Sequence, residues 1–361
     1  MRRALERPYS AVLDPLTLPP RSAGNDIVLW EHRCVTDAAT PAAPTVTVKL
    51  EHVSAVAIGV NDESGALPAS IMACVALIDG AALDPSKVVF VITGDFVESV
   101  RSRLPADLRH LYHATRGGGI VGGKTMDVGD GVHVIVPSFC FEDVAEPGFD
   151  YAERDKLVQR MVLHEAQHVT MLQAREDGTL TRTGEGEARW NFLACADSVI
   201  SEYRAEAGVP VSHRPELFSW SPDEVLMQLR SDLGRIATVE YQSHLDVRKL
   251  AYDVLTEAQT AWKLLGNIVA ARAVGEIAAD AAFEPDVEAS VEWKLMGAPH
   301  WRQFADILAG MPSSAVRIAA DDLSAARSLL ADLFDEWLVT LGFKWSDADQ
   351  TFHVTSWRLY E

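Results

Sequence analysis

The sequence predicts an α+β fold with a mixed sheet near the N-terminus and a large, mostly helical C-terminal part. Two apolar, β-branched runs predict buried strands, KVVFVITGD at 87–95 and VHVIVPSF at 132–139. From residue 151 onward, apolar residues recur mainly at the spacing of an amphipathic helix. Because 361 residues suffice for about two domains, we expect an irregular arm at 1–45, an α+β domain at 46–215 and a helical domain at 216–361.

The first half of the chain alternates between strand-like and helix-like segments. TVTVKLEHVSAVAIGV at 45–60 is β-branched and partly alternating, which predicts one or two strands. Helical spacing predicts one helix at 68–78 and a second at 96–113. Residues 1–45 are rich in Pro, Ala and Arg and show neither pattern.

Helices dominate the second half. A long helix is predicted from residue 151 to Asp177-Gly178, and a polar loop at 176–187 separates it from a helix at 188–207. Helical spacing continues over 222–341, and the alternating tail at 352–360 predicts a last strand. One stripe of the first long helix carries Leu157, Met161, His164, His168 and Leu172.

Composition excludes several classes of protein. The formal charge of −20 repels phosphate backbones, so we expect no nucleic-acid partner. No stretch of 18 apolar residues and no apolar signal region are present, so we expect no membrane partner and a cytoplasmic location. A disulfide scaffold is not expected from four widely spaced cysteines, Cys34, Cys74, Cys140 and Cys195.

The most informative motif is HExxH at residues 164–168. Two histidines at i and i+4 lie on one face of a helix, so His164 and His168 can both bind one metal ion. Glu165, next to the first histidine, is placed to accept a proton from a metal-activated water. This combination of residue types predicts a catalytic Zn²⁺ site, with Glu165 as general base.

A third ligand is expected from the next helix, where Glu202 and Glu206 lie four residues apart. With these residues, the segment 155–207 resembles the gluzincin type of zinc metallopeptidase. The resemblance implies that His164, His168 and Glu202 bind Zn²⁺ and that Glu206, where the family usually has Asp, orients a ligand histidine. It also implies a zincin-like catalytic domain and a peptide or protein substrate.

The spacing of the ligands departs from the gluzincin pattern, and the position of the substrate-binding edge strand is left open. The 33 residues between His168 and Glu202 exceed the compact family spacing, so an extra loop at about 176–187 is required. Zincins place the active-site helix beside a sheet whose edge strand binds extended peptide. That edge strand is expected at Ile120–Met126 or Val132–Pro137.

Competing motifs leave alternatives. GGIVGGKT at 118–125 matches a phosphate-binding loop formally, but a strand rather than a helix is predicted after it, which favours a glycine-rich hairpin. Cys140 lies upstream of HExxH, as a ligand cysteine does in peptide deformylases, although the other deformylase motifs are missing. For Cys195 we expect packing.

The reaction class is also left open by the sequence. A donor to a developing oxyanion is expected in a hydrolase, and Tyr203, Tyr241, His244 and His300 are candidates. A metallopeptidase is the leading hypothesis. A deformylase-like or other metal-dependent amidase on the same site, or a non-enzymatic interaction protein with a structural or decayed metal site, are the alternatives; the oligomeric state is unknown.

Overall fold

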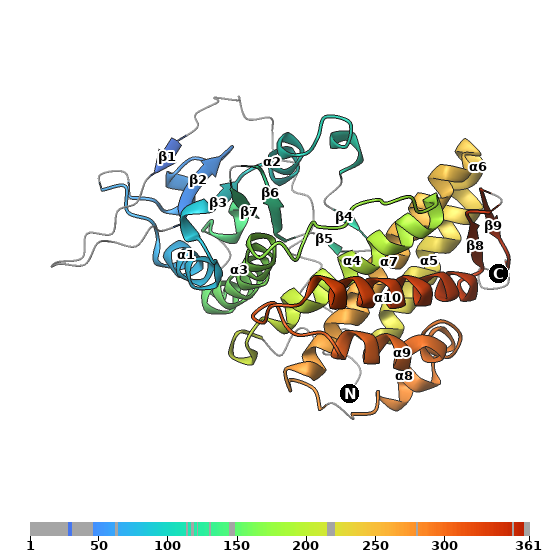
Figure 1. Cartoon of the computed structure of the whole chain (residues 1–361). Coiled ribbons are helices and arrows are strands. Elements are labelled where there is room, and N and C mark those ends of the chain that lie inside the picture. Colours follow the sequence, from blue (N-terminus) through green and yellow to red (C-terminus); the bar gives the residue numbers. More distant parts are fainter. Residues whose placement is uncertain are drawn as a thin grey trace.

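The structure, a computed structural model of the chain, describes residues 28–30, 46–61, 64–112, 115–116, 119–120, 122–129, 131–143, 149–214, 221–278, 281–348 and 350–356. Within these ranges it confirms the α+β class. A five-stranded sheet with its helices lies beside a larger body of helices, and α3 runs close to the boundary between the two (Figure 1).

The sheet is mixed, and its central strands are parallel. β2, β3 and β7 run parallel, whereas β1 and β6 pair antiparallel at the two edges. In spatial order the strands are β1 (Val28–Trp30), β2 (Thr47–Glu51), β3 (Val88–Thr93), β7 (Val132–Pro137) and β6 (Lys124–Asp127). Parallel neighbours need a crossover, and α1 (Ala69–Ala81) and α2 (Phe96–Arg103) lie in the two crossovers.

Alternation along the strands gives the sheet two apolar faces. Phe90 and Val134 belong to the face that packs against α1 and α3 (Tyr151–Gln173). Val91 and Ile135 belong to the opposite face, where they pack with Val100 of α2. Because both faces are covered, the runs at 87–95 and 132–139 read as continuous apolar sequence.

The structure corrects one expectation for the first half and decides between the alternatives of two others. The helix predicted at 96–113 ends at Arg103, because Leu104 precedes a proline and is extended. In the described residues up to 112, a 3₁₀ turn, Arg109–Leu111, is the only helical element that follows. Of the one or two strands predicted in the segment 45–60, one forms, Thr47–Glu51, and Val56–Ile58 is a 3₁₀ turn. Val132–Pro137 is not an edge, since β7 lies between β3 and β6.

Some sequence expectations fall outside the described residues. The irregular arm at 1–45 is described only at Val28–Trp30, which forms β1 against β2. The domain boundary near 215 falls in the undescribed residues 215–220. The tail strand is confirmed over Thr351–Val354, and residues 357–361 lie outside the description.

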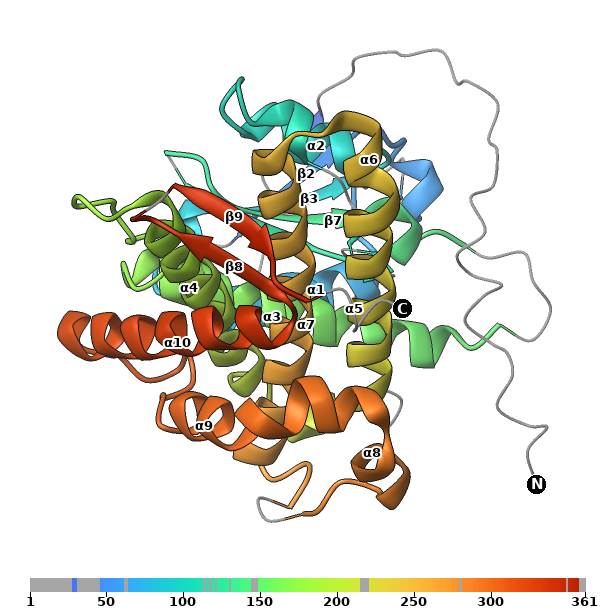
Figure 2. The ribbon, with the colours of Figure 1, turned by 90° about the vertical axis from the view of Figure 1, so that its right-hand side faces the viewer.

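The C-terminal body is mostly helical, as predicted. In Figure 2, α5 and α7 run side by side, α10 lies roughly perpendicular to them and packs on α4 and α9, and the short β8–β9 hairpin lies beside α7. Its elements are α4 (Glu187–Ala207), α5 (Pro222–Arg235), a π-helical turn (Ile236–Glu240), α6 (Tyr241–His244), α7 (Val247–Ala273), α8 (Pro285–Ala289), a second π-helical turn (Trp293–Gly297), α9 (Ala298–Ala309), α10 (Ala320–Thr340), β8 (Phe343–Ser346) and β9 (Thr351–Val354).

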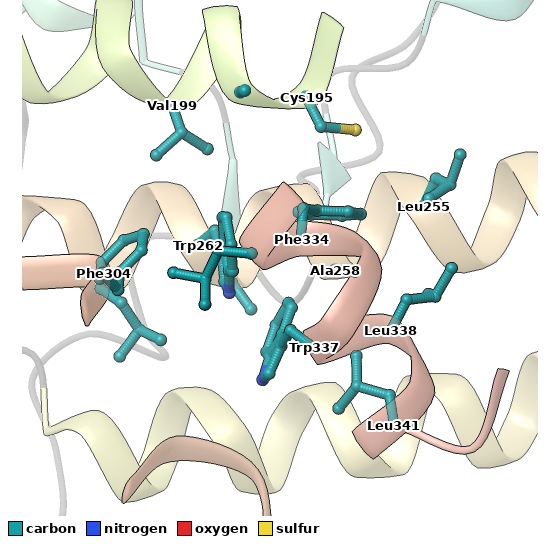
Figure 3. Close-up of a cluster of buried hydrophobic side chains, with 14 of the residues drawn as sticks. Cys195, Val199, Leu255, Ala258, Trp262, Phe304, Phe334, Trp337, Leu338 and Leu341 are labelled. Atoms are coloured by element: carbon teal, nitrogen blue, oxygen red, sulfur yellow. The ribbon is translucent and has the colours of Figure 1, made fainter. Parts of the chain in front are cut away.

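The core of this body is aromatic. Trp262 of α7 stacks on Trp337 of α10 with ring centroids 5.1 Å apart, and the Trp337 indole donates a hydrogen bond to the Met296 carbonyl at 2.7 Å. Cys195 and Val199 of α4 face this cluster (Figure 3). One side of α4 is therefore buried in the helical core, which leaves its other side to meet α3.

An ion pair network links the sheet to α2. Glu51, at the end of β2, accepts hydrogen bonds from Arg103 at 2.7 Å and from Ser99 at 2.8 Å. Burial works to raise the pKa of Glu51, but the bonds from Arg103, Lys49 and Ser99 outweigh it and lower the pKa to about 2.

We predict that Glu51→Gln destabilises the protein at pH 7 by about 1–3 kcal/mol, because Arg103 loses a charged partner. Since the pKa falls from an ordinary value of 4.5 to about 2 on folding, Glu51 stabilises the native state fully above about pH 4.5. That stability is lost as the pH falls toward 2.

Urea unfolding at pH 7 and pH 3 measures this effect, with Glu153→Gln as the control because the Glu153–Lys156 pair is exposed. A difference between wild type and Glu51→Gln that is no larger at pH 7 than at pH 3 contradicts the prediction.

Candidate metal centre

Burial sets the rotation of α3 about its axis. Val162, Ala166 and Val169 are fully buried in the core beneath the sheet. His164 and His168 lie on the other side of the helix, which faces α4, and their side chains are 14% and 13% exposed. The apolar stripe thus aims both histidines at the neighbouring helix.

The structure brings together the three residues predicted as metal ligands. One ligand atom from each of His164, His168 and Glu202 lies within 4.8 Å of the other two. The Glu202 Oε2 atom is 3.3 Å from His164 Nε2 and 3.9 Å from His168 Nε2. No second group of three or more His, Cys, Asp or Glu side chains lies this close in the described ranges.

Each histidine presents its Nε2 atom to this cluster, because a carboxylate lies at its Nδ1 atom. His164 Nδ1 is 2.9 Å from Glu206 Oε2, and His168 Nδ1 is 3.3 Å from Asp177 Oδ2. The Ser201 hydroxyl lies 3.1 Å from the same His168 nitrogen and donates to Asp177 at 2.7 Å. A carboxylate at Nδ1 favours a proton there, which leaves the Nε2 lone pair for a metal.

The position predicted for Glu206 is the one the structure gives it, although the side chain is Glu rather than Asp. Glu206 is 2% exposed and forms ion pairs with Arg160 and with Arg214, the latter at 3.3 Å. Burial works to raise the pKa of Glu206, but the hydrogen bond with His164 and the charges of His164 and the two arginines lower it to about 2. Glu206 is therefore ionised at neutral pH.

Asp177 was missed as a site residue, because the sequence indicated only the end of a helix there. The helix ends earlier than predicted, at Gln173, and Arg175 adopts a left-handed φ of 57°. The Glu176 N–H returns to the Met171 carbonyl at 2.9 Å, and its carboxylate pairs with the buried Arg204 at 2.9 Å. This turn places Asp177 beside His168.

The donor set fits zinc. Two imidazole nitrogens and one carboxylate oxygen form a common ligand set of catalytic zinc sites, which keep a further position open. Burial works to lower the pKa of His164, but Glu202 and Glu206 outweigh it and raise the pKa to about 10. His164 is thus protonated at neutral pH in the metal-free protein, and a metal must displace that proton to bind Nε2.

Glu165 lies against the edge strand β6. The Thr125 hydroxyl is placed to donate to the Glu165 carboxylate at 2.7 Å or to its main-chain carbonyl at 3.0 Å. A Cβ atom at Gly123 would come within 2.9 Å of Glu165 Cγ, and one at Gly122 within 2.7 Å of the Met161 sulfur. The glycine pair therefore lets the strand approach the HExxH helix.

The strand β6 also bears on whether the glycine-rich segment 118–125 is a phosphate-binding loop or a hairpin. Thr125 lies within β6, which pairs antiparallel with β7, and beyond their last pair the Val128 N–H donates to the Gly131 carbonyl at 2.9 Å. In the described residues a strand pair, and no helix, directly follows Thr125, as predicted, which favours the hairpin over a phosphate-binding loop.

Lys263 was not predicted as a site residue. Its Nζ atom lies 3.0 Å from Glu202 Oε1, the carboxylate oxygen turned away from the closest histidine contacts. Burial works to raise the pKa of Glu202, but Lys263 and the two histidines hold it well below its usual range. Nothing in the local sequence indicates this contact, because Lys263 lies 61 residues from Glu202.

The other candidates lie elsewhere in the fold. Cys140 is packed in the core beneath the sheet and Cys195 in the helical core, and burial raises the pKa of each thiol to about 12. Tyr203 is 1% exposed within the helical core, and His300 Nε2 lies 2.9 Å from the Thr340 hydroxyl. Two further candidates, Tyr241 and His244, lie together on α6.

Comparison with known proteins gives no match among family models, curated proteins or solved structures. The resemblance of residues 155–207 to gluzincins therefore stays a prediction. In the part of the chain that the structure describes, no helix combines the length and the apolarity needed to cross a bilayer.

We predict that Asp177→Asn weakens zinc binding about 10–100-fold, because His168 loses the charged partner that orients it. Competition with a chromophoric chelator measures the dissociation constant. Asp155→Asn, which removes a carboxylate that pairs with Arg154 and not with a histidine, is the matched control. Equal zinc affinity in the two variants contradicts an orienting role for Asp177.

Proposed function

We propose that this protein is a zinc-dependent hydrolase that cleaves peptide bonds. The observation that supports this most is the convergence of His164, His168 and Glu202, with a carboxylate behind each imidazole. Two histidines that bind no metal would not each need a carboxylate to orient the imidazole ring. Glu165, between the two histidines in sequence, is the residue that a purely structural metal site does not need.

Zn²⁺ held by these three side chains would supply a Lewis acid that lowers the pKa of water to about 7 and polarises a carbonyl. Glu165 accepts the proton of the attacking water and delivers it to the leaving amine. Thr125 orients the Glu165 carboxylate through its 2.7 Å hydrogen bond. Glu206 and Asp177 keep the two histidines turned toward the metal.

The choice of a peptide over another amide is supported by β6. This strand is the last in the described sheet, antiparallel to its neighbour, and in contact with Glu165 through Thr125. An edge strand offers unpaired main-chain groups to an extended peptide. The pairing of an edge strand with the HExxH helix also supports the zincin-like arrangement implied by the resemblance.

We predict that the purified protein binds about one zinc per chain and that His164→Ala abolishes this binding, because one of three ligands is lost. Elemental mass spectrometry measures the metal content, and Glu202→Ala is expected to lower it too. His353→Ala, on the exposed face of β9, is the control. Absence of zinc in the wild-type protein after incubation with zinc contradicts the proposal.

We predict that Glu165→Gln lowers peptide turnover by about 10²–10⁴-fold while zinc stays bound, because the amide cannot accept the proton. A peptide library followed by mass spectrometry gives the rates, and Glu153→Gln on the same helix is the control. Retained turnover excludes Glu165 as the base. Cleavage of small amides but of no peptide identifies an amidase instead.

A further inference from the structure

The two oxygens of Glu202 have different partners. Oε2 faces the Nε2 atoms of His164 and His168 at 3.3 and 3.9 Å. Oε1 is 3.0 Å from the Lys263 ammonium. One carboxylate is thus shared between the predicted metal position and a cation from α7.

The packing of α7 holds Lys263 in this place. Its neighbour Trp262 is 2% exposed and stacks on Trp337 in the helical core. Consecutive helical residues point about 100° apart, so Lys263 leaves that core toward the side of α4 that carries Glu202. At Gly266 a Cβ atom would lie 3.9 Å from Val199, in ordinary van der Waals contact, so α7 packs directly on α4.

A lysine beside a metal ligand is electrostatically unfavourable for metal binding, because the ammonium repels a dication. In the metal-free protein the ammonium balances the buried charge of Glu202, as Arg160 and Arg214 balance the charge of Glu206. A bound dication would supply that balance by itself. With metal bound, the contact between Lys263 and Oε1 therefore has a second consequence.

This consequence concerns the number of Glu202 oxygens that can bind the metal. A carboxylate can bind a metal through one oxygen or through both, and binding through both fills a second coordination position. A charge-assisted hydrogen bond from Lys263 engages Oε1 and leaves only Oε2 for the metal. We propose that Lys263 is a positioning residue that keeps Glu202 a one-oxygen ligand, so that a coordination position stays open for water or substrate. This inference rests on the proposed zinc site.

The test replaces the ammonium and reads the coordination number directly. Lys263→Met removes the charge and keeps most of the side-chain volume, whereas Lys263→Arg keeps a charged donor. Lys249→Met is the matched control, because Lys249 also lies on α7 and pairs with a carboxylate, Asp253, at an exposed position. X-ray absorption of the zinc protein and the visible spectrum of the cobalt-substituted protein report the number of ligands.

We expect four-coordinate metal in the wild type, Lys263→Arg and Lys249→Met, and five-coordinate metal in Lys263→Met. The zinc dissociation constant of Lys263→Met should fall about tenfold or more, because a repulsive charge is lost and a ligand atom is gained. If Lys263→Met does not fold, as judged by circular dichroism, Lys263→Ala takes its place.

The failures can be told apart. A wild-type protein that binds neither zinc nor cobalt overturns the proposed function and this inference with it. A wild type that binds metal, together with a Lys263→Met variant of unchanged coordination number, overturns only the role of Lys263. The same holds if Lys263→Arg behaves like Lys263→Met, because a charged donor would then not be what matters.

Discussion

The candidate site depends on the packing of α4 between two cores. Cys195 and Val199 anchor one side of this helix among the aromatic side chains of α7 and α10. That burial fixes the rotation of α4, and its other side then carries Glu202 and Glu206 to the histidines of α3. Since interiors are close-packed, a rotation of α4 would disturb the aromatic core before it moved the carboxylates.

Charge balance is the second requirement of the site. Several ionised groups lie in a mostly buried space, and each has a partner of opposite charge or a hydrogen-bonding neighbour. Glu206 pairs with Arg160 and Arg214, while Glu202 pairs with Lys263. Because an unpaired charge in such a place costs several kcal/mol, these cations are as necessary to the geometry as the carboxylates. They also keep the carboxylates ionised, which is the form that orients histidine and binds metal.

Much of the local structure could be predicted from sequence, because its signals are local. The buried strands at 87–95 and 132–139 and the helix at 188–207 follow from periodicity and β-branching. The helix predicted at 96–113 was too long, because Leu104, which precedes Pro105, ends it early. Periodicity also left two segments open as the edge strand, and the edge is β6 and not β7. Strand order is set by nonlocal pairing, which periodicity does not contain.

For the candidate site, the sequence by itself predicted the three candidate ligands and one candidate orienting group. HExxH places two imidazoles on one helix face, and the spacing of Glu202 and Glu206 places two carboxylates on another. Only the tertiary structure decided how these faces meet and which further residues join them. Asp177, Thr125 and Lys263 come from a helix-terminating turn, an edge strand and a distant helix. Their contacts arise from the packing of separate elements, and such packing leaves no mark in the spacing of nearby residues.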